Sequence, residues 1–99
     1  VTADVSFISL EKVLPAARRV APCASMVVLI KPQFEAGRDQ VGKGGVVRSP
    51  EVHEAVVEKI RRFAVESLGM DWAGVLESPL RGPAGNKEFL AFLRPLQVF

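Results

Sequence analysis

The sequence is poor in the residues that make redox and metal sites. Its 99 residues include one cysteine, Cys23, and one histidine, His53. A single cysteine excludes an internal disulfide framework, and neither residue has a partner at the spacing of metal ligands. No apolar run reaches the roughly 18 residues that a membrane span needs, and the first residues lack the basic start of a signal peptide. We therefore expect a cytoplasmic protein without a metal site.

Charge of one sign is also scarce. Thirteen Lys and Arg residues face eleven Asp and Glu residues, so the net charge is only +2 although the pI is about 9.0. This balance permits an anionic partner but does not require one. The chain is 48% hydrophobic and 24% charged, as in ordinary globular domains, and its length supports one core. These values exclude a disordered tail and a coiled coil.

The first half of the chain predicts one helix and one strand after an initial strand tip. Residues 1–9 fit the end of a buried strand, and a helix to about Val20 follows, with a short turn and a kink at Pro15. The apolar run 25–30 is typical of a strand covered on both faces of a parallel or mixed sheet. Pro32 ends this strand and keeps the residue before it extended. Residues 35–49 hold four glycines and predict a long, mobile loop.

The second half predicts a long helix over residues 50–68. Ser49 is its expected cap and Gly69 its stop. Its apolar residues repeat at helical spacing and predict one buried stripe, made of Val52, Ala55, Val56, Ile60, Phe63, Ala64 and Leu68. Two strands, over 72–77 and 88–93, follow around a turn-rich connector. This order predicts the closing half of an α/β fold, a mixed sheet with two helices whose last two strands pair antiparallel.

Three ionisable residues stand at the ends of these strands. Asp4 lies at the tip of the first apolar segment, Lys31 ends the most apolar strand, and Glu88 opens the last strand. Ligands of open α/β sheets bind outside the carboxyl ends of the parallel strands. We therefore expect all three side chains at one edge of the sheet. Solvated strand boundaries are the alternative reading.

The other motifs in the sequence give weaker evidence of a function than these three residues do. Residues 37–43 match the G-x-x-x-x-G-K pattern of a phosphate-binding loop, but Gly44 follows where a Ser or Thr would hold magnesium. Two interpretations of this segment remain: a basic loop that contacts a polyanion, or a loop that is simply solvated. His53 is expected at the surface or boundary of the long helix and Cys23 in a structural role within a turn. No serine stands in a nucleophile-elbow context.

Four longer sequence words occur in a fixed order. They are D-V-S-F-I-S-L at 4–10, K-P-Q-F-E at 31–35, G-G-V-V-R at 44–48 and G-P-A-G-N-K-E-F at 82–89. Together they resemble the C-terminal part of the hemolysin-A (TlyA-type) family, which are FtsJ-like ribosomal RNA 2′-O-ribose methyltransferases. The resemblance covers nearly the whole chain.

The resemblance implies a Rossmann-like methyltransferase fold that uses S-adenosylmethionine. Carried over onto matching positions, it implies catalytic roles for Asp4, Lys31 and Glu88, with Asp4 also binding the cofactor. The family's cofactor-binding half, its first catalytic lysine and its S4-like domain are absent from residues 1–99. The chain is thus expected to be the C-terminal portion of the methyltransferase domain and to be inactive alone.

Ribose oxygen is favoured over base nitrogen as the methyl acceptor. Enzymes that methylate exocyclic nitrogens carry a proline pair and an aromatic residue after the corresponding aspartate, whereas residues 4–7 read D-V-S-F. In this mechanism Lys31 takes the proton of the hydroxyl, Asp4 orients the hydroxyl or steers the sulfonium, and Glu88 holds Lys31 in place.

The resemblance also implies ribosomal RNA or a ribosomal subunit as partner. Candidate RNA contacts are the basic residues Arg38, Lys43, Arg48 and Arg81, each equally explicable as a solvated charge. A non-catalytic module that binds RNA or a protein is the alternative function. A membrane-active hemolysin has little support because no cationic amphipathic helix is present. An exposed sheet edge could let the chain self-associate.

Overall fold

A four-stranded mixed sheet forms the frame of the molecule. The computed structural model describes residues 2–3, 9–21, 23–37, 40–42, 44–82 and 85–95. The strands are β1 (Thr2–Ala3), β2 (Met26–Ile30), β3 (Met70–Glu77) and β4 (Phe89–Pro95), in the spatial order β1-β2-β4-β3. β1 runs parallel to β2, and β4 pairs antiparallel with both β2 and β3. The predicted mixed sheet with an antiparallel last pair is confirmed.

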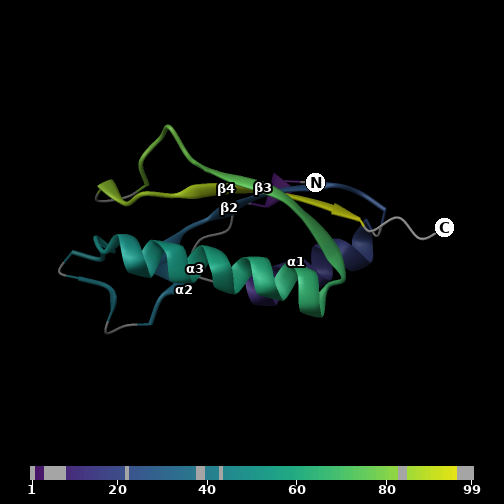
Figure 1. The fold of residues 1–99 in the computed structure, drawn as a ribbon, viewed down its shortest axis with the longest axis horizontal. Helices are drawn as coiled ribbons and strands as arrows, with labels where there is room; N and C mark the ends of the chain where they lie inside the picture. Colours follow the sequence, from purple (N-terminus) through teal and green to yellow (C-terminus); the bar gives the residue numbers. More distant parts are fainter. Residues whose placement is uncertain are drawn as a thin grey trace.

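The described helices lie on one face of this sheet (Figure 1). They are α1 (Leu10–Val20), the single turn α2 (Pro32–Glu35) and α3 (Pro50–Arg62), which continues as a π-helical turn, η2 (Phe63–Ser67). Burial along β2 follows this one-sided cover: Met26, Val28 and Ile30 are buried, while the two residues between them are only half-buried. The expectation that β2 is covered on both faces is therefore wrong for the described part of the chain.

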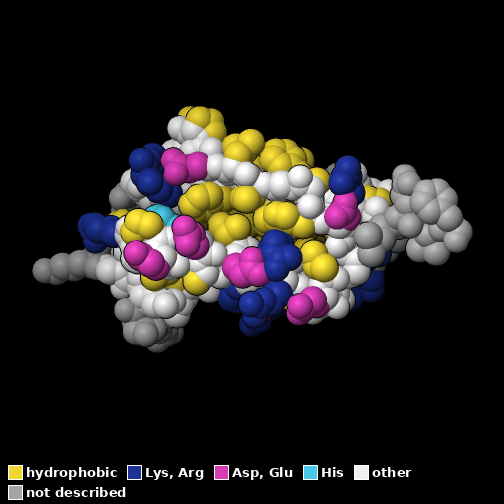
Figure 2. All heavy atoms as spheres, in the orientation of Figure 1, with side chains coloured by type: hydrophobic (Ala, Val, Ile, Leu, Met, Phe, Trp, Pro, Cys, Tyr) yellow, Lys and Arg dark blue, Asp and Glu magenta, His cyan; other side chains and the backbone are white. Residues whose placement is uncertain are grey.

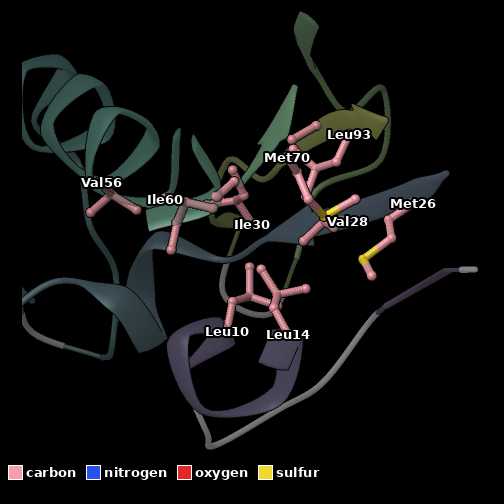
Figure 3. Close-up of a cluster of buried hydrophobic side chains, with 11 residues drawn as sticks. Leu10, Leu14, Met26, Val28, Ile30, Val56, Ile60, Met70 and Leu93 are labelled. Atoms are coloured by element: carbon pink, nitrogen blue, oxygen red, sulfur yellow. The ribbon is translucent and has the colours of Figure 1, made fainter. Parts of the chain in front are cut away.

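The core lies between the sheet and the helices. In Figure 3 the side chains of Leu10 and Leu14 from α1 approach Val28, and Val56 and Ile60 from α3 approach the end of β2. All five side chains are at most 3% exposed. Burying an aliphatic side chain of this size contributes about 1.5–3 kcal/mol. This contact fixes the position of both helices relative to the strand ends that carry the candidate site.

Helix α1 is continuous through Pro15, so the prediction of a separate short turn before it is wrong. Ser9 caps the helix, and its hydroxyl accepts a hydrogen bond from the backbone N–H of Glu11. Proline removes one backbone donor from a helix interior. Leu10 and Leu14, which both precede Pro15 in the helix, are buried. Their packing keeps the helix continuous despite the missing hydrogen bond.

Helix α3 begins as predicted, with Ser49 as its cap and Pro50 at its first position. The predicted stripe is buried at Val56, Ile60 and Ala64, but Ala55 is exposed, so the stripe is narrower than expected. The last turn of the predicted helix is wound as the π-helical turn η2. Gly69 then adopts φ +63°, which a residue without a Cβ tolerates best.

The segment 35–49 is more ordered at its ends than a mobile loop. Its first residue, Glu35, belongs to α2 and is 7% exposed, and Val47 near its end is 2% exposed. The prediction of an uninterrupted mobile loop over 35–49 is therefore wrong at both ends. Within the described residues, no helix is long and apolar enough to cross a membrane. No group of three or more potential metal-ligating side chains occurs there either.

Candidate active site

Lys31 and Glu88 lie at the same edge of the sheet. Ile30 is the last residue of β2 and pairs with Phe89, the first residue of β4. Lys31 follows one member of this pair and Glu88 precedes the other, and facing residues of an antiparallel ladder are about 4.5–5.5 Å apart at Cα. The strand register thus brings together two residues separated by 57 positions in the sequence. Their catalytic roles stay predictions.

Asp4, the third residue of the expected cluster, lies outside the described residues. The two positions before it are strand β1, in which Ala3 pairs with Val28 of β2. β1 is therefore parallel and adjacent to β2, as the topological argument requires. Whether Asp4 joins Lys31 and Glu88 is not settled by this pairing and stays a prediction.

The carboxylate of Glu88 is buried and closely confined. Glu88 is 6% exposed, and its Oε2 accepts a hydrogen bond of 3.0 Å from the amide Nε2 of Gln33. A Cβ built on Gly82 would lie 2.0 Å from the same Oε2. Only glycine leaves room for the carboxylate there. The Glu88 carbonyl accepts a hydrogen bond of 2.8 Å from the backbone N–H of Ser78, which fixes the backbone as well.

Gln33 brings helix α2 into the site. Pro32 occupies the first position of this helix, so the turn begins directly after Lys31. While Nε2 of Gln33 donates to Glu88, its Oε1 is buried and has no hydrogen-bond partner among the described residues. Reversing the amide would set its oxygen against a carboxylate oxygen, so the observed orientation is the favourable one. This acceptor is thus an exception to the rule that buried polar atoms are hydrogen-bonded, within the described part of the chain.

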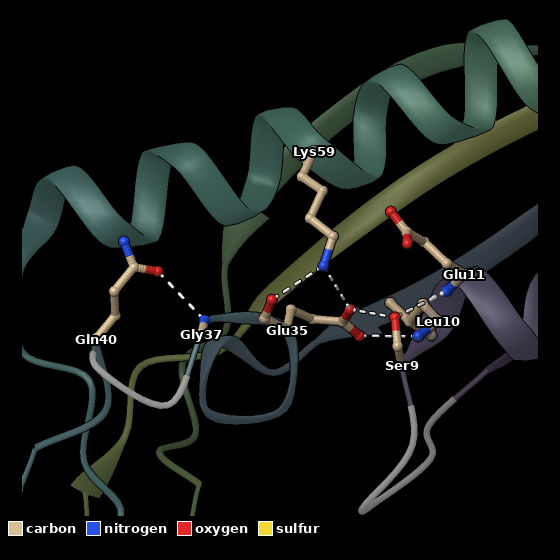
Figure 4. Close-up of polar contacts among 7 residues, drawn as sticks. All are labelled: Ser9, Leu10, Glu11, Glu35, Gly37, Gln40 and Lys59. Carbon is tan, nitrogen blue, oxygen red and sulfur yellow. Dashed lines mark hydrogen bonds and ion pairs between the residues drawn. The ribbon is translucent and has the colours of Figure 1, made fainter.

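Glu35 anchors the other end of α2 (Figure 4). Its carboxylate accepts hydrogen bonds from the Ser9 hydroxyl at 2.7 Å and from the Leu10 backbone N–H at 2.8 Å. Lys59 of α3 lies 3.8 Å from the carboxylate and donates a 3.0 Å hydrogen bond to the Glu35 carbonyl. One buried side chain therefore links the start of α1, the turn after Lys31 and the middle of α3. No local pattern in the sequence indicates this role for Glu35.

Asn86 joins two of the recognised sequence words. It is 2% exposed, its Oδ1 accepts from the Val47 backbone N–H at 2.9 Å, and its Nδ2 donates to the Gly45 carbonyl at 2.9 Å. These bonds tie the segment around residues 45–47 to the turn that leads into Glu88. Asparagine is common in turns for local reasons, so the sequence alone did not indicate this long-range contact.

His53 is buried, so its expected position at the surface or boundary is wrong. It is 7% exposed, and its Nε2 lies 2.9 Å from the Val47 carbonyl. A carbonyl oxygen only accepts hydrogen bonds, so Nε2 carries the proton in this contact. The ring also packs against Phe89, with centroids 5.7 Å apart. Cys23, by contrast, is exposed in a turn.

The basic candidates divide into two groups. Arg48 and Arg81 are exposed, and a guanidinium nitrogen of Arg81 donates to the Gly85 carbonyl at 3.4 Å. Arg38 and Lys43 lie outside the described residues, and their contact with RNA stays a prediction. Arg48 and Arg81 line the same pocket, together with His53 and Lys87.

Comparison with known proteins decides the family. The model of the FtsJ-like methyltransferase family matches residues 1–94. The chain belongs to the FtsJ-like methyltransferase family. Its Rossmann-like fold class and the hemolysin-A resemblance are thereby confirmed.

Relatives whose function is named support this assignment. The 16S/23S rRNA (cytidine-2′-O)-methyltransferase TlyA of Mycobacterium tuberculosis is 50% identical over 98 residues, which are 95% of this chain and 35% of that protein. Hemolysin A of Brachyspira hyodysenteriae is 38% identical over 95 residues, covering 92% of this chain and 38% of the relative. A crystal structure titled as a "putative hemolysin" from Lactococcus lactis matches with a TM-score of 0.89 and 45% identity, over 95% of this chain and 45% of the other.

The FtsJ-like chain thus spans just over a third of the length of the curated relatives it matches. The family implies S-adenosylmethionine as cofactor. The described residues do not make up a site for it by themselves, because no glycine-rich turn between a strand and the start of a helix is present among them. They do supply an amine, a carboxylate and an unpaired amide oxygen at one sheet edge.

Proposed function

We propose that this chain is the C-terminal part of the catalytic domain of a longer enzyme that methylates a ribose 2′-hydroxyl of ribosomal RNA. The observation that carries the proposal is that Lys31 and Glu88 both lie directly beyond the Ile30–Phe89 register pair, at one edge of the sheet, in a chain 50% identical to an rRNA (cytidine-2′-O)-methyltransferase. The cofactor-binding half and an S4-like RNA-binding domain then belong to the remainder of the enzyme, which works in the cytoplasm on RNA or a ribosomal subunit.

The types of residue at this edge are suited to the deprotonation and orientation of a hydroxyl group. A ribose hydroxyl is a weak nucleophile and reacts better when a base accepts its proton as the new bond forms. We assign this base to the Nζ of Lys31, which can accept a proton only in its neutral form. S-adenosylmethionine, when bound, supplies the methyl group. Asp4 is assigned to orient the hydroxyl or the sulfonium, and Glu88 to hold the Lys31 amine in position.

Confinement of Glu88 supports its assignment as a positioning group. The buried carboxylate accepts a hydrogen bond from the Gln33 amide and lies close against the backbone of Gly82. Holding reacting groups within a narrow range of positions contributes several kcal/mol to a transfer reaction.

Substitution of Lys31 tests the proposal in the full-length protein. Lys31→Ala should lower methyl transfer from labelled S-adenosylmethionine to ribosomal RNA by about 10²–10⁴-fold, the range of a lost general base. Lys12→Ala is the matched control, because Lys12 is exposed on α1. The circular dichroism of both variants should match the wild type. Wild-type turnover in the Lys31→Ala variant would remove Lys31 from the mechanism.

The alternative, a non-catalytic RNA- or protein-binding module, is separated by cofactor binding. Calorimetric titration of S-adenosylmethionine should give binding to the full-length protein and none to the 99-residue chain. Absence of binding to both would favour the module. Self-association through the sheet edge at which the missing strands would pair, the β1 edge of the described sheet, stays a prediction.

A further inference from the structure

A small pocket opens beside the candidate active site. Its volume is about 250 Å³, and it lies between the segment 46–48, the first turn of α3 and the turn 81–87. The lining residues are Val46, Val47, Arg48, His53, Arg81, Gly85 and Lys87. Figure 2 shows basic side chains near the histidine at this end of the molecule, with acidic side chains also close to it.

The charge of the lining is of one sign. Among the described residues that line the pocket, Arg48, Arg81 and Lys87 contribute three cations and none is a carboxylate. The two other grooves described in the chain each include at least two glutamates. The pocket also lies at the N-terminus of the 13-residue helix α3, where the helix dipole adds a partial positive charge. An anion is the ligand that this combination favours.

We propose that this pocket binds a backbone phosphate of the RNA strand, next to the nucleotide presented to Lys31. The identity of the ligand as RNA depends on the proposed function, whereas anion binding depends only on the lining. Sequence neighbours connect the two places: Lys87 directly precedes Glu88, and Arg81 directly precedes Gly82, which confines the Glu88 carboxylate. A phosphate held here would set the distance from the strand backbone to the catalytic edge.

The pocket walls are fixed before any ligand arrives. Asn86 ties Val47 to the turn of Arg81 and Lys87, and His53 binds the Val47 carbonyl from α3. Three segments that are distant in sequence therefore keep their basic residues at one place. Preorganisation of this kind lowers the entropic cost of binding.

Two acidic side chains near the pocket compete only weakly. Glu77 lies 3.6 Å from the Lys87 ammonium, but both side chains are 40% or more exposed. Such exposed pairs contribute about 0–1 kcal/mol, so a phosphate can compete for the ammonium. Glu51 accepts a 2.8 Å hydrogen bond from the Ser49 hydroxyl and does not line the pocket.

Salt-dependent RNA binding tests the proposal in the full-length protein. The probe is a fluorescent single-stranded RNA oligonucleotide, measured by anisotropy between 50 and 200 mM salt. For each phosphate contact removed, the slope of log affinity against log salt should fall by about 0.7. Over this salt range that change corresponds to about a 2.6-fold smaller loss of affinity. We expect this result for Arg48→Gln and for Arg81→Gln.

The control is Arg62→Gln, which removes the same charge at the opposite end of α3 and should leave the slope unchanged. A second arm adds inorganic phosphate, with chloride at equal ionic strength as reference, and follows the backbone amides by NMR. Phosphate should shift the amides of Val47 and Arg48 in the wild type but not in Arg48→Gln. Unshifted amides, or slopes in both pocket variants equal to that of the control, would overturn the proposal.

Failure of the catalytic proposal gives a different pattern. Lys31→Ala should abolish methyl transfer while keeping the wild-type salt slope, because Lys31 does not line the pocket. If the wild type transfers no methyl group to ribosomal RNA but the pocket variants flatten the slope, the phosphate site stands and the proposed reaction does not. If phosphate shifts the pocket amides but RNA slopes do not change, the assignment to RNA is wrong.

Discussion

The substitution Asn86→Ala should destabilise the chain far more than its small change in size suggests. Asn86 is buried and bridges the Gly45 carbonyl and the Val47 N–H. Alanine lacks the side-chain amide, so both of these backbone groups lose their hydrogen-bond partner at once. Water can reach the carbonyl of Gly45, which is exposed, but not the N–H of Val47, which belongs to a residue 2% exposed. The main cost is therefore one unpaired, buried backbone donor.

The magnitude follows from that donor. A buried polar group left without a partner costs about 1–3 kcal/mol, and the lost amide contacts add a smaller amount. We expect the free energy of unfolding to fall by about 2–3 kcal/mol. For a domain of about 100 residues, each kcal/mol lowers the melting temperature by about 4–8 °C, so the expected decrease is about 10–20 °C.

Thermal denaturation measures the global effect, and amide hydrogen exchange localises it. A local loss of about 2 kcal/mol should speed exchange of the Val47 amide roughly 30-fold. Gln40→Ala is the matched control, because the Gln40 amide also accepts a backbone hydrogen bond, from Gly37, but at an exposed site. It should change stability by less than about 0.5 kcal/mol. An Asn86→Ala protein as stable as this control would refute the role given to the bridge.

Three further substitutions test other contacts. Gly82→Ala should reduce methyl transfer by the full-length protein with little loss of stability, because the new Cβ would displace the Glu88 carboxylate; unchanged kcat would count against a tightly positioned Glu88. Glu35→Ala should lower the free energy of unfolding by about 2–4 kcal/mol in denaturant titrations, because it removes buried hydrogen bonds to a charged acceptor; a loss below 1 kcal/mol would contradict this. The hydrogen bond from Arg61 lowers the pKa of Glu58 in the folded chain. The pair therefore stabilises the fold at pH values above the ordinary carboxyl pKa, and this stabilisation is lost as the pH falls through the lowered pKa. An NMR titration of Arg61→Gln should show the Glu58 pKa rising towards its ordinary value.

Local signals were sufficient to predict most of the elements and the sheet edge that Lys31 and Glu88 share, although the single turn α2 was not expected. The cap at Ser49 and the apolar repeat placed the start and face of α3 correctly. The proline after Lys31 marked the end of β2, and the antiparallel return strand then brought Glu88 to the same edge. These predictions succeeded because each depends on neighbouring residues or on simple chain topology.

The polar contacts that hold the site could not be predicted in the same way. Glu35 meets Lys59 across 24 positions and Asn86 meets Val47 across 39, and neither pair shows a local pattern. His53 was misjudged for a related reason. Its neighbours in the helix do not reveal that the Val47 carbonyl and the Phe89 ring cover it.

Pairing of Ile30 with Phe89 limits how the sequence can change in length. Adding one residue within β4 would turn its side chains to the opposite face and move Glu88 away from Lys31. Adding one between Pro79 and Leu80, outside both strands of the hairpin, would leave the pairing intact. Insertions and deletions among related enzymes should accordingly gather in that connector and avoid the strand.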